Sequence, residues 1–516
     1  VDGESNQFQS NASEGVASVN LRGLGPQRTL VLINGKRQTP ISARLPGGRF
    51  VDINSMPKLA VERVEVLKEG AAATYGSDAI AGVVNFLTRK NFEGFEVSAG
   101  HQEIDGSDGN QEFGAIFGKD FGNISWVTSF GYETRSELSL REIENAQVSF
   151  AENPRGGFSS IGNPGEFFDP QDPSLSSSNS SVDPNCTALG AVLTGPVCRF
   201  RFTDFDNAIE EEERYQLFSE INGELSNGMN FHAEVMYAKI DVPEWKTSPS
   251  YPPQALFGDI QFVPVTHPGL QNMAAQFPAE FNKFLTPTVT SVDDPATTED
   301  EFRTTSGTGA TFFGRIQGLG ASEGRQAKRE YDTYRVAGTL DGEFENGVGW
   351  DVGLSWSRNN GELEGVDAQI GKTKLAFQGF GGENCAANLD ATGALVQNGA
   401  TAGAGGCLYF NPFSNSIASS NAEFSNGAAN PSFVPSVANS AEVLAYLDDT
   451  SLTETQSELL VLDVVFQGEL FGGDAAWAGG YQYRDLNITQ DIDDLINLNI
   501  NPCPFVGQTN CGSETG

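Results

Sequence analysis

Long segments in which large apolar residues alternate with small or polar ones make up much of the chain after residue 90. Trp350, Val352 and Leu354 are large and apolar, and Asp351 and Gly353 lie between them. A period of two residues is typical of β-strands with one apolar face. The pattern predicts nine strands, at about residues 93–104, 111–121, 124–138, 213–225, 230–242, 329–345, 349–363, 454–470 and 475–489.

Two architectures share this alternation: a soluble sandwich with one wet face, and a transmembrane barrel that faces lipid outside and a polar lumen inside. The connections decide between them. Short turns such as 226–228 and 345–347 alternate with polar connections of roughly 75 to 90 residues, which count against a compact soluble domain. Outer-membrane barrels combine short periplasmic turns with long extracellular loops. We therefore expect an all-β transmembrane barrel.

Composition excludes several other classes. The formal net charge is −37, from 31 Lys+Arg and 68 Asp+Glu, so a phosphate backbone would be repelled and no nucleic acid is expected as partner. No apolar run reaches the ~18 residues of a membrane-spanning helix. The histidines at 101, 232 and 267 lack metal-ligand spacing, so we expect no metal and no cofactor. No nucleophile–base pattern appears, and we do not expect an enzyme.

The first ninety residues have a different sequence pattern from the rest of the chain. Short apolar runs at 29–33 and 64–67 sit between Gly-rich turns, which predicts a small mixed α/β unit. The predicted domains are therefore 1–90, the small unit, and 91–516, the barrel region with its long loops. Nine strands is an odd number for a bacterial single-chain barrel, so the sequence is expected to be a portion of a longer protein.

The six cysteines form three close pairs in the long connections. Fifteen pairings are open in principle, but pairing of nearest neighbours would staple three separate loops. An oxidising compartment fits this usage. The predicted disulfides are Cys186 with Cys198, Cys385 with Cys407, and Cys503 with Cys511.

Three stretches of the first ninety residues carry a family resemblance: 19–37 (VNLRGLGPQRTLVLINGKR), 51–70 around VDINSMP and VERVEVLKEG, and 71–86 (AAATYGSDAIAGVVNF). They resemble the plug domain of TonB-dependent outer-membrane receptors. The resemblance implies a plug inside a 22-stranded barrel, located in the bacterial outer membrane among lipid and lipopolysaccharide. It also implies TonB as partner, through a box that this sequence does not contain.

The resemblance further implies roles for particular residues. Arg22, Arg63 and Glu65 are expected to lock the plug to carboxylates of the barrel, since bidentate Arg–carboxylate pairs fix a register. The alternative is that these are solvated loop charges. Residues expected to touch substrate at the plug apices are Gln38, Thr39, Arg44, Tyr75 and Ser77. For Tyr75, a packed aromatic at the plug edge is an equal alternative.

The implied function is TonB-dependent active import of a scarce nutrient, either an organic nutrient such as an oligosaccharide or a peptide, or an iron chelate. The alternative is a surface-binding or structural outer-membrane receptor with a static plug. Aromatic residues in the acidic long loops suit neutral ligands such as oligosaccharides or peptides better than an anionic iron chelate. These aromatic residues are Phe167, Phe168, Phe281, Phe284, Tyr409, Phe410 and Phe413.

Overall fold

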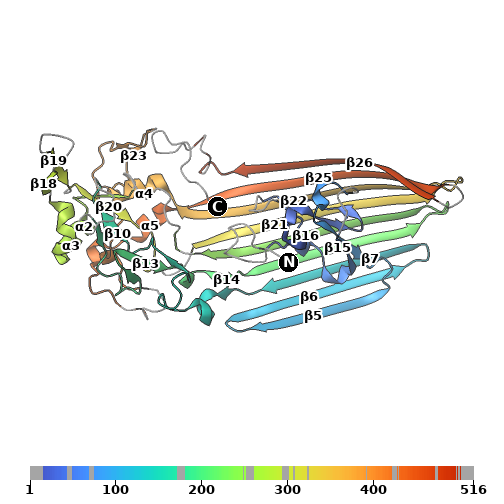
Figure 1. Ribbon diagram of the computed structural model, residues 1–516, viewed down its shortest axis with the longest axis horizontal. Coiled ribbons are helices and arrows are strands. Elements are labelled where there is room, and N and C mark those ends of the chain that lie inside the picture. Colours follow the sequence, from blue (N-terminus) through green and yellow to red (C-terminus); the bar gives the residue numbers. More distant parts are fainter. Residues whose placement is uncertain are drawn as a thin grey trace.

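The computed structural model describes residues 15–500 with internal gaps. The gaps are 44–48, 69–74, 171–179, 248, 251–260, 287, 293–300, 306–307, 322–324, 391, 421–426, 428, 471–474, 496 and 498–499. Three parts are visible along the long axis: a large sheet, a small plug against it, and a loop unit at one end (Figure 1).

The large sheet is antiparallel and contains nine strands in the order β26-β25-β22-β21-β16-β15-β7-β6-β5. Their bounds are β5 Gly94–Ile104, β6 Ser107–Asp120, β7 Ile124–Arg135, β15 Glu212–Glu224, β16 Asn230–Thr247, β21 Arg325–Glu343, β22 Gly349–Ala368, β25 Asp448–Leu470 and β26 Ala475–Ile492. Each corresponds to one predicted strand, so the barrel-wall prediction is confirmed. The long connections all leave from one end of the sheet, here called the outer end.

The outward face of the sheet is apolar between two levels of aromatic residues. Tyr237 and Tyr334 pair at 5.1 Å between ring centroids toward the outer end, and Phe344 lies beside the short turn at the other end. The ten residues from Tyr334 to Phe344 cover about 34 Å along a strand. At a tilt of about 40° that is roughly 26 Å along the membrane normal, which matches the apolar band of outer-membrane barrels.

The plug contains a four-stranded sheet in the order β2-β1-β4-β3, with a parallel β1–β4 pair. Its elements are η1 Leu21–Gly23, η2 Pro26–Arg28, β1 Thr29–Ile33, β2 Lys36–Arg37, η3 Ile53–Ser55, η4 Lys58–Ala60, β3 Val61–Leu67, η5 Ser77–Ala79 and β4 Gly82–Thr88. Strand β1 is buried along its whole length, because its alternate residues face the plug core and the barrel wall. Asn34 and Gly35 turn β1 into β2 with positive φ angles of 48° and 77°.

The long connections fold together into an outer-loop unit. Its strands are β8 Leu138–Ser139, β9 Phe158–Ser159, β10 Glu166–Phe168, β11 Ser180–Val182, β12 Val192–Thr194, β13 Val197–Arg201, β14 Asn207–Ile209, β17 Phe262–Pro264, β18 Thr288–Val292, β19 Glu301–Thr305, β20 Gly309–Phe313, β23 Asn388–Leu389 and β24 Leu395–Val396. Its helices are α2 Pro268–Gln276, α3 Pro278–Leu285, α4 Ile370–Phe377 and α5 Ala441–Leu447, with 3₁₀ turns η6 Leu140–Glu142, η7 Glu144–Ala146, η8 Phe202–Asp204, η9 Ser414–Ser416 and η11 Pro435–Val437. Within the described ranges, no helix is both long and apolar enough to cross a membrane.

The outer-loop unit has its own hydrophobic core, built from three different connections. Phe167, Phe281, Phe312 and Phe413 are each 0% exposed and belong to one cluster. The rings of Phe167 and Phe413 stack at 4.3 Å although 246 positions separate them in the numbering. The prediction that the loop aromatics face a ligand is therefore wrong for the phenylalanines of this core, because they bury one another instead.

Candidate functional site

The plug packs against the inward face of the large sheet, and this interface is the candidate functional site (Figure 1). Two small apolar clusters join the two parts. In one, Ile33 and Met56 of the plug pack with Phe218 and Met236 of the wall. In the other, Ile41 and Phe50 meet Ile240 and Tyr331. The contacts between and around these clusters are polar.

The β1–β2 turn of the plug reaches acidic residues on three wall strands. Lys36 Nζ lies 3.2 Å from Asp351 Oδ1 and 3.8 Å from Asp463 Oδ2. Asn34 Nδ2 donates to Glu234 Oε2 at 2.7 Å. Because strand alternation turns these carboxylates inward, a short cationic turn can bind several strands at once.

Arg335 of β21 is fully buried at the interface, with its side chain 0% exposed. Its Nε donates to Glu234 Oε1 at 2.6 Å, and one terminal nitrogen donates to the carbonyl of Arg37 at 2.6 Å. The same nitrogen lies 3.2 Å from Gln38 Oε1. A wall arginine thus binds both a wall carboxylate and the plug backbone, which fixes the plug at this height.

Small hydroxyl and amide groups continue the interface toward the outer end. The Thr39 amide donates to Ser357 Oγ at 2.9 Å, and Thr39 Oγ1 lies 3.0 Å from Ser457 Oγ. The Ser42 amide donates to Asn359 Oδ1 at 2.7 Å. Backbone groups of the plug are thereby satisfied by the wall, as buried donors require.

The end of β4 and the helical turn η4 contact the first wall strands. Thr88 Oγ1 donates to Glu220 Oε2 at 2.8 Å, and Arg89 pairs with Glu96 at 2.8 Å. On the other side, Lys58 Nζ lies 2.6 Å from Glu112. Plug donors therefore also reach inward carboxylates of the first wall strands.

Two plug carboxyls have shifted pKa values. Burial raises the pKa of Asp52 to about 7, although hydrogen bonds from the Ala17 and Asn54 amides oppose the shift. Burial also acts to raise the pKa of Asp78, but bonds from Arg484 of β26 and from Arg37 outweigh it and the pKa is lowered. Asp78 is therefore held as a carboxylate that links the plug to the wall.

The structure corrects part of the predicted lock. Arg63 pairs with Glu65 at 3.0 Å and with Glu62 at 3.6 Å, all on β3, and both Arg63 and Glu65 are more than half exposed. Arg63 pairs with these neighbours in place of the expected barrel carboxylate, because Glu62 and Glu65 lie within two positions of it on the same strand. Arg22 lies in η1 with φ 60°, and its lock role stays a prediction.

The predicted apex residues have four different outcomes. Gln38 and Thr39 are 4% and 2% exposed, so their predicted substrate contact is corrected to a contact between plug and wall. Tyr75 packs on the cluster of Leu30 and Val83, which is the alternative reading for this residue. Ser77 is exposed beside Asp78, and its substrate role stays a prediction, while Arg44 lies outside the described residues.

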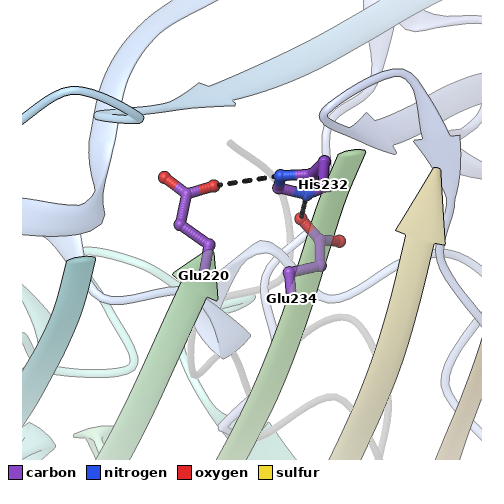
Figure 2. A group of neighbouring side chains, drawn as sticks. All are labelled: Glu220, His232 and Glu234. Atoms are coloured by element: carbon purple, nitrogen blue, oxygen red, sulfur yellow. Dashed lines mark hydrogen bonds and ion pairs between the residues drawn. The ribbon is translucent and has the colours of Figure 1, made fainter. Parts of the chain in front are cut away.

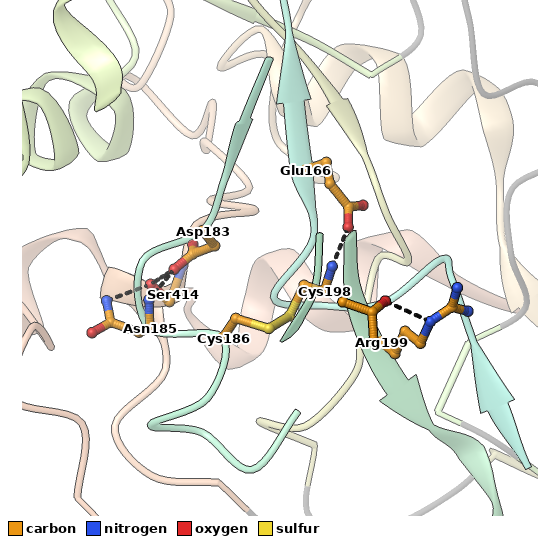
Figure 3. Close-up of a disulfide and its surroundings, with 8 residues drawn as sticks. Glu166, Asp183, Asn185, Cys186, Cys198, Arg199 and Ser414 are labelled. Carbon is orange, nitrogen blue, oxygen red and sulfur yellow. Dashed lines mark hydrogen bonds between the residues drawn. A yellow bond between two sulfur atoms is a disulfide. The ribbon is translucent and has the colours of Figure 1, made fainter. Parts of the chain in front are cut away.

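Two of the three predicted disulfides are confirmed. Cys186 bonds Cys198 and Cys385 bonds Cys407, both in the outer-loop unit. Figure 3 shows the first bridge with Glu166, whose Oε1 accepts from the Cys198 amide at 2.5 Å. The third pair, Cys503 and Cys511, lies outside the described residues.

One group of side chains in the wall was not predicted from the sequence. The β15–β16 register places Glu220 directly opposite Glu234, and His232 is two residues before Glu234 on the same face. The three side chains point toward one another in Figure 2 and are buried. The signal was available, because the tight turn between the strands fixes this register from the sequence.

A polar cavity of about 410 Å³ lies beside the plug at the outer end of the first wall strands. Each cation that lines it is paired: Lys58 with Glu112 and Glu133, and Arg135 and Arg214 with Glu212. The remaining groups are amides, a hydroxyl and an imidazole, from Asn54, His101, Gln102, Asn110, Gln111 and Thr134.

The wall has nine strands and an apolar outward face, and the plug lies against its inward face through mainly polar contacts. These features define a plugged outer-membrane barrel protein. Residues 3–83 match the family model for the TonB-dependent Receptor Plug Domain. The first part of the chain is thus similar to the plug of TonB-dependent receptors, and the matched relative reported next is an outer-membrane protein.

Individual relatives are similar over limited parts of their length. Over 75 residues, 14% of this chain, the sequence is 43% identical to an iron-regulated outer membrane virulence protein of Vibrio cholerae, and the match covers 12% of that relative. A variant of the ferric enterobactin receptor of Pseudomonas aeruginosa aligns with 95% of this chain and 51% of its own, at 12% identity and TM-score 0.36. The ferric-catecholate import receptor Fiu of E. coli K12 aligns with 95% of this chain and 48% of its own, at 9% identity and TM-score 0.37.

Proposed function

We propose that this protein imports a scarce nutrient across the bacterial outer membrane, with TonB supplying the pull on the plug. Residues 1–90 act as the movable plug, and residues 91–516 supply barrel wall and outer loops. The observation that carries the proposal is the plug–wall interface, where hydrogen bonds and ion pairs surround only two small apolar clusters. Each such hydrogen bond contributes only about 0.5–1.5 kcal/mol net, because water can replace either partner. A directed pull can break them one after another.

A disulfide between plug and wall tests whether the plug moves. Thr39 Oγ1 and Ser457 Oγ are 3.0 Å apart, so Thr39→Cys combined with Ser457→Cys places two sulfur atoms within reach of each other. We expect the oxidised double variant to lose uptake and the reductant to restore it, while each single variant transports normally. Undiminished uptake by the oxidised variant would show that transport does not require plug movement, whereas a wild type without uptake would support the other class of function, a receptor with a static plug.

We infer that the substrate is an organic, hydrophilic and largely uncharged molecule such as an oligosaccharide or a peptide. The buried loop phenylalanines do not support this choice of substrate. The support comes from the polar cavity beside the plug at the outer end of the first wall strands. Its amide and hydroxyl groups offer both donors and acceptors. Its cations Lys58, Arg135 and Arg214 are each occupied by a glutamate, which leaves the cavity poorly suited to an anionic chelate.

Expression and uptake distinguish the two substrate classes. An importer of an organic nutrient should be induced by growth on polymeric carbon or peptides, and a deletion strain should lose uptake of the labelled oligomer. Induction by iron starvation alone, with loss of labelled iron uptake, would show an iron chelate as substrate, in keeping with the name of the Vibrio cholerae relative. That result would leave the transport proposal intact.

A further inference from the structure

Glu220, His232 and Glu234 form a buried group on the inward face of β15 and β16 (Figure 2). Their exposed fractions are 1%, 9% and 2%. One ligand atom from each residue lies within 4.8 Å of the others. Two carboxylates and an imidazole are a ligand set that divalent transition metals use.

The hydrogen bonds of His232 leave one ring nitrogen facing an oxygen. Nδ1 lies 2.6 Å from Asn222 Oδ1 and 3.7 Å from Glu220 Oε2, and in the Nδ1–H tautomer it donates to Asn222 Oδ1. In a neutral imidazole Nε2 then has a lone pair, and it lies 3.0 Å from Glu234 Oε2, which is also an acceptor. In this tautomer the two facing acceptors need a positive charge between them, which is either a proton on Nε2 or a metal ion. A metal ion that both groups ligate would form bonds of about 2.0–2.1 Å.

Glu220 provides a third ligand without losing its plug contact. Its Oε2 accepts from Thr88, whereas its Oε1 is buried and accepts no hydrogen bond within the described chain. On Glu234, Arg335 occupies Oε1. Glu234 Oε2 accepts from Asn34 with one lone pair, and its second lone pair can bind an ion.

We propose that Glu220, His232 and Glu234 bind a divalent transition-metal ion of the zinc type, with Asn222 as the positioning residue that holds the His232 tautomer. A ligating histidine normally donates its other N–H to such a partner. The ion links β15 to β16 at the carboxylates to which Thr88 and Asn34 of the plug are bonded. Metal occupancy therefore stiffens the part of the wall that holds the plug.

The test uses the full-length protein purified from outer membranes and stripped with a chelator. Zn²⁺ binding is measured by equilibrium dialysis, and Co²⁺ is used as a visible probe of an imidazole–carboxylate site. We expect one Zn²⁺ per chain, lost in His232→Ala and weakened about ten- to a hundredfold in Asn222→Ala. His101→Ala removes a histidine outside the group and should bind normally.

Glu220→Gln keeps the size of the side chain and its bond to Thr88, and it should also weaken Zn²⁺ binding. The plug should exchange hydrogen more slowly with Zn²⁺ in the wild type and in His101→Ala, and at an unchanged rate in His232→Ala. The proposal fails if Zn²⁺ binding is absent, or if it is equal in the wild type and His232→Ala. Absent binding with an imidazolium signal from His232 would show that a proton, not a metal, lies between Nε2 and Glu234.

Discussion

Arg335 of β21 and Glu234 of β16 form an ion pair of 2.6 Å in which both side chains are almost fully buried. Each of them also contacts the plug, Arg335 at the Arg37 carbonyl and Glu234 at Asn34. A charge pair that belongs entirely to the wall thus presents a donor and an acceptor to the plug. The Arg335–Glu234 pair is therefore already positioned within the wall to bind the plug.

Replacing Arg335 with Ala should release the plug more than any other single change at the interface. Glu234 would be left buried without its guanidinium, which costs about 3–5 kcal/mol when one partner of a buried pair is removed. Hydrogen exchange of β1 and β2 should speed up strongly. Arg358→Ala is the control, because Arg358 and Glu458 pair at 2.5 Å with both side chains about one-third exposed. Equal plug protection in both variants would contradict the assignment.

Lys36 and Lys58 both bridge the plug to wall carboxylates but differ in burial. The Lys36 side chain is 14% exposed and that of Lys58 is 66% exposed. Lys36→Met should weaken plug retention by about 1.5–3 kcal/mol, the range for hydrogen bonds to charged groups. Lys58→Met should cost no more than about 1 kcal/mol, as for surface pairs, and its effect should vanish in high salt. Leak of small solutes through reconstituted protein measures both.

The outer-loop unit should become less stable as pH rises. Burial raises the pKa of Glu166 to about 8, while the Cys198 amide opposes the shift. An unfolded glutamate titrates near ~4.3, so between that pH and about 8 the folded state holds more protons than the unfolded one. Stability therefore falls as pH rises through this window, and the loss is complete above it.

Hydrogen exchange of the outer-loop unit, followed between pH 5 and pH 9 after correction for intrinsic rates, checks this prediction. Glu166→Gln keeps an acceptor for the Cys198 amide but cannot ionise, so its stability should fall less steeply across the window than that of the wild type. Asp390→Asn is a matched control in an exposed turn, where hydrogen bonds from Thr392 lower the pKa of the carboxyl. A slope in Glu166→Gln equal to that of the wild type would assign the pH dependence to another group.

The two disulfides should support the outer-loop unit without affecting the wall. Cys186–Cys198 and Cys385–Cys407 close segments with sequence separations of 12 and 22. Chain entropy gives roughly 3 kcal/mol for a loop of this size. Reduction should therefore speed proteolysis of the outer loops, while the strands of the sheet stay protected. Free thiols in the native protein, found by mass spectrometry, would contradict the pairing.

Local patterns were sufficient to predict the wall. A strand such as β22 shows its alternation within its own residues, and the short turns indicate which strands are neighbours. The tight turn between β15 and β16 even fixes Glu220 opposite Glu234. The plug contacts could not be predicted in this way. Lys36 and Asp351 are 315 positions apart, and no periodicity relates the height of the plug to the register of the wall.

The loops show a different limit of sequence reasoning. Phenylalanines scattered over three polar connections gave no local sign of a shared core, and an aromatic residue in a long loop is as compatible with ligand stacking as with burial. Only the tertiary arrangement brings Phe167, Phe312 and Phe413 together. Burial of apolar residues can offset the conformational entropy that a long connection loses when it becomes ordered, whereas a purely polar loop lacks this gain.

Truncation of Phe413 tests this core directly. Phe413 stacks on Phe167 and makes edge contact with Phe281, and it is 0% exposed. Phe413→Ala should destabilise the outer-loop unit by about 3–5 kcal/mol through lost contacts and a residual cavity. Leu193→Ala, at a side chain 49% exposed in the same unit, should change stability by no more than about 0.5 kcal/mol. In limited proteolysis from the outer face, Phe413→Ala should be cut faster than the wild type and Leu193→Ala should not. If the unit stays resistant and substrate binding alone falls, Phe413 faces the ligand after all.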